Sequence, residues 1–242
     1  MLCIDDLKTL REAYRETDDG WLIDAMRRIG NPSEEAIVDF ALEQMRQPDR
    51  NRRVLALRVL ARQRGERAMR GVLAGLHDDK RRVCAVAIQA CPNFLENEAI
   101  VARLEAMARD AGRKRKLRRR ALSMLAGDEG RWGGDLTPAA SGALWRLIAE
   151  PDYRFGIVFG LVRLELGARV KLLLEAFARS EDSVERALAA RRLAGERVIH
   201  IGDYEGDATL QRWIMGNCDV ARGRMYYWLP REAAPATAHS VK

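Results

Sequence analysis

Residues 48–61 read PDRNRRVLALRVLA, in which an aspartate is followed four positions later by an arginine and three positions after that by an alanine. The same D-x-x-x-R-x-x-A spacing returns in residues 77–90 (HDDKRRVCAVAIQA) and in residues 180–194 (SEDSVERALAARRLA). The motif residues are Asp49, Arg53 and Ala56, then Asp78, Arg82 and Ala85, then Asp182, Arg186 and Ala189. A spacing that recurs along a chain indicates a repeat protein built from one supersecondary unit.

Each motif residue has a physical role at the start of a helix. An aspartate there accepts hydrogen bonds from free backbone N–H groups and faces the positive end of the helix dipole. An arginine four residues later lies one turn along the same face, within reach of an acid of its own repeat or the next. A small alanine lets a neighbouring helix approach. The motif therefore predicts three helix starts.

Other segments carry apolar residues at helical spacing, which predicts further helices between the motif copies. They are residues 21–29, 37–45, 69–76, 100–107, 144–148 and 170–177, with degenerate motif copies at 118–122 and 151–154. We expect about six helical pairs over residues 1–195, then a capping segment over 196–232 that contains Tyr226, Tyr227 and Trp228, and a disordered tail over 233–242. Trp21, Trp145 and Trp213 have helical spacing to apolar neighbours and are predicted to lie in the core.

The three motif stretches resemble the HEAT-repeat family, over about four-fifths of the chain. The first two copies lie 29 residues apart, which resembles the compact bacterial HEAT-like type more than the roughly 40–47 residues of longer HEAT repeats. The tetratricopeptide and ankyrin signatures, W-x-x-L-G-x-x-Y and T-P-L-H, are absent. The resemblance implies an all-α, right-handed α-solenoid with a C-terminal cap, whose arginine- and alanine-bearing helices line the concave surface.

Positive charge is concentrated in one part of the chain. Residues 46–120 contain 21 Lys and Arg against 8 Asp and Glu, a net charge of +13, whereas the remainder carries −6. Stacked pairs would place the basic clusters along one ridge, which would attract a phosphate backbone or an acidic protein. An internal ladder in which Arg53 and Arg82 pair with aspartates is the alternative. The candidate binding residues are Arg50, Arg52, Arg53, Lys80, Arg81, Arg82, Arg113, Lys114, Arg115, Lys116, Arg118, Arg119 and Arg120.

Signs of catalysis are scarce. The three histidines lie far apart, and the sequence has no P-loop, G-x-S-x-G, H-E-x-x-H or G-x-G-x-x-G motif, so we expect no cofactor, no metal and no catalytic residue. Trp132 lies in a glycine-rich loop three residues before Asp135. HEAT-like DNA glycosylases use aromatic residues and an aspartate, but no further motif maps onto them.

The cysteines and the hydropathy pattern favour a cytoplasmic protein. None of the four cysteines belongs to a C-x-x-C pair, the N-terminus has no signal-peptide character, and no stretch approaches 18 apolar residues. We expect a non-enzymatic scaffold that binds another protein through its curved surface. Nucleic-acid binding through the basic ridge is the alternative, and a HEAT-like DNA glycosylase is a distant third.

Overall fold

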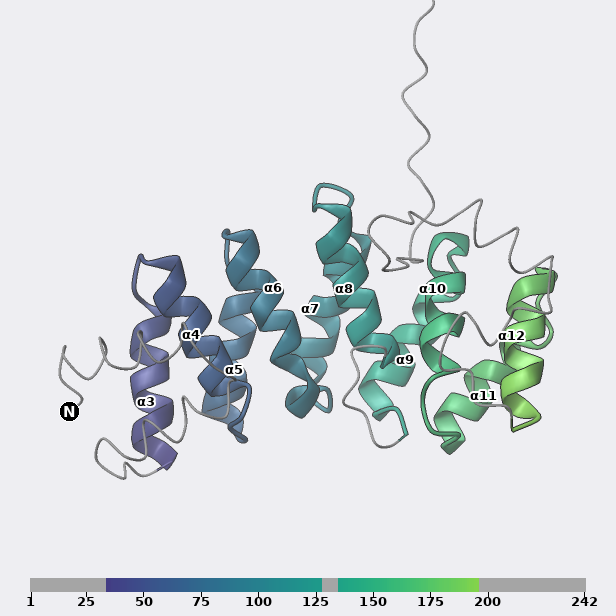
Figure 1. The fold of residues 1–242 in the computed structure, drawn as a ribbon, viewed down its shortest axis with the longest axis horizontal. Helices are drawn as coiled ribbons and strands as arrows, with labels where there is room; N and C mark the ends of the chain where they lie inside the picture. The colour runs from purple at the N-terminus through teal and green to yellow at the C-terminus, as the bar shows by residue number, and fades with distance from the viewer. Residues whose placement is uncertain (1–33, 128–134, 196–242) are drawn as a thin grey trace, which may run out of the picture. The chain divides into compact units, whose positions relative to one another are not determined.

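The computed structural model describes residues 34–127 and 135–195, and these residues form ten α-helices, one short 3₁₀ helix and no strand (Figure 1). The prediction of an all-α chain is confirmed for them. The expected helix at 21–29, the capping segment at 196–232 with its aromatic cluster, and the tail at 233–242 lie outside this part of the chain.

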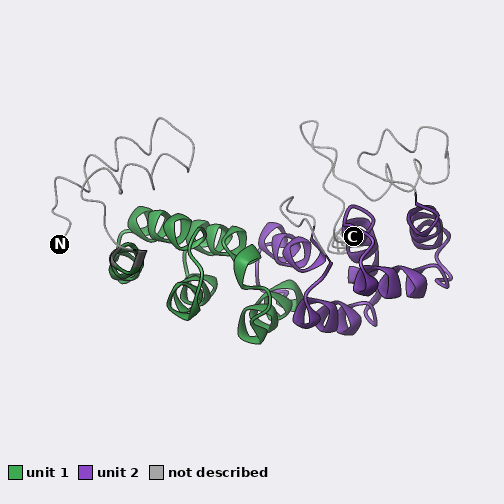
Figure 2. Cartoon of the chain, turned by 90° about the horizontal axis from the view of Figure 1, so that it is seen from below, with its two compact units in different colours: residues 1–110 green, residues 111–242 purple. Residues whose placement is uncertain are grey.

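The chain divides into two compact units, residues 1–110 and residues 111–242 (Figure 2). Unit 1 contains α3 (Glu34–Met45), α4 (Arg50–Leu60), α5 (Glu66–Leu76), α6 (Arg81–Gln89), η1 (Cys91–Phe94) and α7 (Glu98–Arg109). Unit 2 contains α8 (Arg115–Ala126), α9 (Pro138–Leu147), α10 (Pro151–Leu161), α11 (Ala168–Phe177) and α12 (Ser183–Leu193). Every helix that periodicity predicted within the described residues is present.

Alternate helices are neighbours within each unit. In unit 1, α4 packs against both α3 and α6, while α5 packs against α3 and α7. In unit 2, α10 packs against α8 and α12, and α9 packs against α11. Each unit therefore has two layers, because a helix contacts the helix that precedes or follows it and also the helix two places along the chain.

The side chain of the preceding residue caps four of the described helices, which are α4, α7, α9 and α12. Asp49 precedes α4 and accepts from the Asn51 N–H at 2.8 Å, and Asp182 precedes α12 and accepts from the Val184 and Glu185 N–H groups at 2.8 and 2.9 Å. Both confirm the predicted capping role, which satisfies N–H groups that have no partner inside the helix.

The aspartate of the second motif copy, Asp78, does not cap its helix, so the prediction for it is wrong. The residue that precedes α6 is Lys80, and Asp78 lies two positions earlier, where it accepts from the Lys80 N–H at 2.7 Å. The motif of α6 is therefore out of register with those of α4 and α12. The position four residues after the helix cap is held by the buried Cys84, while Arg82 lies in the exposed first turn.

Small residues allow the close packing of α10 on α8. A Cβ atom on Gly160 would lie 2.6 Å from the Ala126 Cβ and 3.0 Å from its carbonyl oxygen. Helix α8 then ends at Gly127, whose φ of +82° is a left-handed conformation that favours glycine. The motif alanines Ala56 and Ala189 are also buried, as expected of positions where helices meet.

Candidate cationic surface

Arg53 is not an exposed binding residue. Its side chain is only 11% exposed, and its Nε lies 2.7 Å from Oδ2 of Asp78, whose side chain is 9% exposed. One guanidinium nitrogen also donates to the carbonyl oxygens of Gln47 and Pro48 at 2.7 and 2.9 Å. Of the two alternatives that the sequence left open, Arg53 therefore follows the internal pairing, because Asp78 neutralises its charge.

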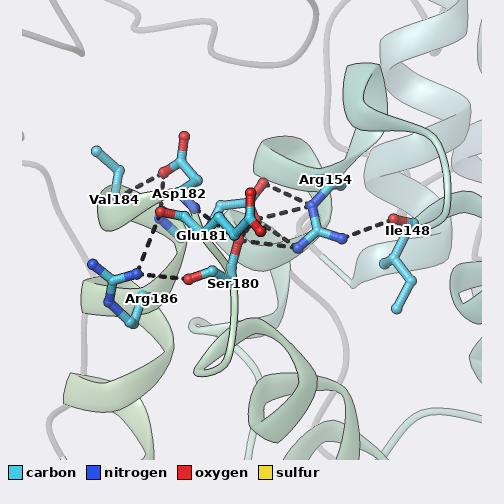
Figure 3. Close-up of polar contacts among 8 residues, drawn as sticks. Ile148, Arg154, Ser180, Glu181, Asp182, Val184 and Arg186 are labelled. Carbon is cyan, nitrogen blue, oxygen red and sulfur yellow. Dashed lines mark hydrogen bonds and ion pairs between the residues drawn. The ribbon is translucent and has the colours of Figure 1, made fainter.

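The same arrangement returns in unit 2 (Figure 3). Arg154 in the first turn of α10 donates to the Ile148 carbonyl oxygen at 3.0 Å and forms an ion pair with Glu185 of α12 at 2.8 Å. Arg186 in the first turn of α12 donates to the Ser180 carbonyl oxygen at 2.7 Å. We call this feature the arginine clamp: Arg53, Arg154 and Arg186 each bind the carbonyl six residues earlier, across the turn that joins two helices.

Four other arginines of the candidate ridge, Arg50, Arg52, Arg81 and Arg82, point away from the core of unit 1. All four are exposed, the first two in α4 and the others in α6. Neither helix has an acidic residue in its first turn. We call these four residues the first-turn arginine patch.

The fifth exposed base of this region, Lys80, has a partner. Its Nζ lies 2.7 Å from Oδ2 of Asp79, and both side chains are more than half exposed. The hydrogen bond from Lys80 is the main reason that the pKa of Asp79 lies below its ordinary value, with the charges of Lys80 and Arg53 adding to it. Asp79 therefore stays ionised, and an ion pair this exposed contributes little to stability.

The third basic cluster belongs to unit 2, where it surrounds the start of α8. Lys114 and Lys116 are exposed, whereas Leu117, which follows them, is buried. The arginines of this cluster are partly buried; they are Arg113, Arg115, Arg118, Arg119 and Arg120. Helix α8 also has no acidic residue in its first turn. The expectation that all three clusters form one continuous ridge stays a prediction.

Asp135 has a structural role at the start of α11. Its carboxylate accepts from the backbone N–H groups of Arg169 and Val170, both at 3.1 Å, while the residue that precedes the helix, Gly167, has no side chain with which to cap it. Burial opposes ionisation, but these hydrogen bonds, a third from the Leu136 N–H and the charge of Arg169 together hold the pKa of Asp135 below its ordinary value. A carboxylate held by three backbone donors is not offered to a substrate. Trp132 lies outside the described residues.

Sequence reasoning missed three exposed apolar side chains in unit 2. Trp145 in α9 is 42% exposed, so the prediction that it lies in the core is wrong. Leu172 on the neighbouring α11 is 55% exposed, and Leu166 between α10 and α11 is 38% exposed. Periodicity placed Trp145 one position after Leu144, which is buried, but could not show that the indole is on the outer side of the helix.

Within residues 34–127 and 135–195, no helix has both the length and the apolar content needed to cross a membrane, and no three His, Cys, Asp or Glu side chains gather as a metal site would require. The two cysteines described there, Cys84 and Cys91, are buried and form no disulfide. No protein-family model matches the chain, and a search of curated proteins gives no match.

Proposed function

We propose that this chain is a non-enzymatic, cytoplasmic scaffold of the HEAT-like kind, in which helical pairs form a right-handed α-solenoid that binds another protein. The arginine clamp supports the repeat interpretation, because the same contact joins the helices at three turns. Contacts between helices two places apart in the chain are also what stacked pairs would produce.

The observation that carries protein binding is the exposure of Trp145 and Leu172 in unit 2. Trp145 and Leu172 lie on neighbouring helices and are about half exposed. Aromatic and aliphatic side chains that stay exposed on neighbouring elements are typical of protein contact surfaces, in which tryptophan often supplies much of the binding energy.

A photo-crosslinking residue placed at position 145 or 172 in the full chain tests this proposal in cells. We expect the same protein to be crosslinked from both positions and not from Ala190, an exposed residue of α12. The purified partner should then bind the wild type saturably, and the double variant Trp145→Ala/Leu172→Ala should bind at least about tenfold more weakly. Equal binding by the wild type and this double variant would reject the surface.

Nucleic-acid binding is the second candidate, and the cationic first turns of α4, α6 and α8 favour it. A gel-shift series over increasing salt tests it with duplex and single-stranded DNA and RNA. We expect binding that weakens steeply with salt, because cations displaced from phosphates drive such association. Neutralising Arg113, Lys114, Arg115 and Lys116 together should weaken it and flatten the salt dependence. No binding at low salt would end this candidate.

A further inference from the structure

We infer that the first-turn arginine patch of unit 1 binds the phosphate backbone of a nucleic-acid duplex without reading its base sequence. This inference rests on the second candidate function, nucleic-acid binding, and goes further by naming the contact residues and the form of nucleic acid. It also separates the residues that contact phosphate from the one that positions them.

The patch exists because α4 and α6 begin at the same end of unit 1. The two helices pack against each other, and the buried ion pair between Arg53 and Asp78 joins the first turn of α4 to the segment just before α6. Packed helices lie roughly 8–10 Å apart. The first turns of α4 and α6, which carry the exposed Arg50, Arg52, Arg81 and Arg82, therefore lie side by side.

Electrostatics make this end attractive to anions. Within residues 34–127 and 135–195, none of the four patch arginines has an ion-pair or hydrogen-bond partner. Of the nearby acids, Asp79 is paired with Lys80, and Asp49 caps the Asn51 N–H. Two helix dipoles also point their positive ends here, which favours a negatively charged ligand. The four positive charges repel one another in the free protein, and bound phosphates would relieve that repulsion.

The surroundings of the patch favour nucleic acid over an acidic protein. The large exposed apolar side chains of the described residues are Trp145, Leu166 and Leu172, and all three belong to unit 2. A protein interface needs an apolar core with aromatic anchors, whereas an interface with nucleic acid is polar and strongly positive. Guanidinium groups also bind phosphate oxygens in a bidentate way.

The lack of a large exposed aromatic side chain in the described part of unit 1 also favours a duplex over a single strand. Proteins that bind single strands stack bases on exposed aromatic side chains. The large exposed apolar residues of the described chain include no aromatic side chain in unit 1. Arginines without such a platform contact phosphates, which fix position on the duplex and carry no base information.

Arg53 is a positioning residue in this arrangement. Its guanidinium is used by Asp78 and by two carbonyl oxygens, so it contributes no free charge to the surface. By joining α4 to the start of α6, it holds the exposed arginines of the two helices next to each other.

Fluorescence anisotropy with a labelled duplex of about 20 base pairs, measured on the full chain over a salt series, tests the inference. Two double variants, Arg50→Gln/Arg52→Gln and Arg81→Gln/Arg82→Gln, each remove two charges from the patch. The matched control Arg62→Gln/Arg64→Gln removes two exposed charges after the C-terminal end of α4. We expect each patch variant to flatten the slope of log affinity against log salt by about 1.8, at roughly 0.9 per phosphate contact, and to weaken binding at least about tenfold. The control should stay within about twofold of the wild type.

Several outcomes would overturn the inference. Equal weakening by the control and patch variants would mean that total charge, not this patch, drives binding. Weakening only in the Arg113–Lys116 variant would keep the nucleic-acid candidate and reject the patch. Tighter binding of a single strand would mean that the patch binds single-stranded nucleic acid. Displacement of the duplex by polyglutamate at equal charge would mean that it binds an acidic protein. No binding by the wild type at low salt would reject both the inference and the candidate function. Circular dichroism confirms that each variant is folded.

Discussion

Arg52 and Arg53 are adjacent in the sequence and face opposite environments. Arg52 is exposed, whereas Arg53 is buried against Asp78 and the carbonyl oxygens of the turn between α3 and α4. One position in a helix rotates a side chain by about 100°, which is enough to exchange the surface for the interior. The charge of an arginine in this chain therefore has to be weighed together with its place in the turn.

This difference predicts unequal effects on stability. We expect Arg53→Ala to lower the free energy of unfolding by about 2–4 kcal/mol, because it leaves Asp78 buried without its partner. The control Arg52→Ala should change it by no more than about 0.5 kcal/mol. Urea unfolding followed by circular dichroism measures both. Similar losses in the two variants would contradict the structural role of Arg53.

The contact between Arg154 and Glu185 is the second test at this scale. The pair joins α10 to α12 at 2.8 Å, and the Glu185 side chain is only 7% exposed. A double-mutant cycle with Arg154→Ala and Glu185→Ala should give an interaction energy of about 1–3 kcal/mol, because each single change leaves the other group unpaired. Additive losses would show that the two side chains act independently.

At the scale of elements, helix contacts differ in how closely they approach. Gly160→Ala should destabilise the protein by about 1–3 kcal/mol, because its Cβ would lie 2.6 Å from the Ala126 Cβ. The control Gly142→Ala has only the Arg146 side chain nearby, at 3.6 Å, and should stabilise α9 by up to about 1 kcal/mol. Thermal melts compare the two, and a melting temperature raised by both changes would mean that α10 is not packed tightly on α8.

Asp135 gives a stability effect that depends on pH. Its pKa is lower in the folded protein than the ordinary 3.8, so its contribution is present above that value and is lost as pH falls below it. Asp135→Asn should cost about 1 kcal/mol near neutral pH, since one oxygen that accepts from α11 is replaced by a donor. Urea midpoints should converge with those of the wild type as the pH falls below 3.8. A constant difference would indicate a steric effect instead.

The helices could be predicted from sequence because apolar residues recur every three to four positions, as in α5 and α7. Three features could not. The start of α6 at Arg81 could not be predicted, because Asp78 has the spacing of a capping residue but forms an ion pair with Arg53 instead. The exposure of Trp145 depends on which side of α9 has a neighbour. The partner of Arg154 lies 31 residues away, and spacing within one helix gives no information on it.

At the scale of the whole molecule, the charged and apolar surfaces belong to different units, since the first-turn arginine patch lies in unit 1 and Trp145 and Leu172 lie in unit 2. Two binding activities can then be removed separately. The double variant Trp145→Ala/Leu172→Ala should keep duplex affinity within about twofold of the wild type. The variant Arg81→Gln/Arg82→Gln should likewise leave binding of the crosslinked protein unchanged. Anisotropy for each ligand measures this, and loss of both activities in one variant would mean that a single surface serves both.

The arginine clamp also bears on how such a chain can change in length. Arg53 and Arg154 each contact a main-chain oxygen behind them and an acidic side chain ahead of them. Main-chain oxygens are present whatever the local sequence, and the acid is supplied by the incoming helix. A duplicated helical pair that carries one such arginine and one such acid therefore contains the side chains needed for the contacts with the pair before it and the pair after it. Gene duplication and loss could therefore add or remove pairs while the neighbouring sequence stays as it was.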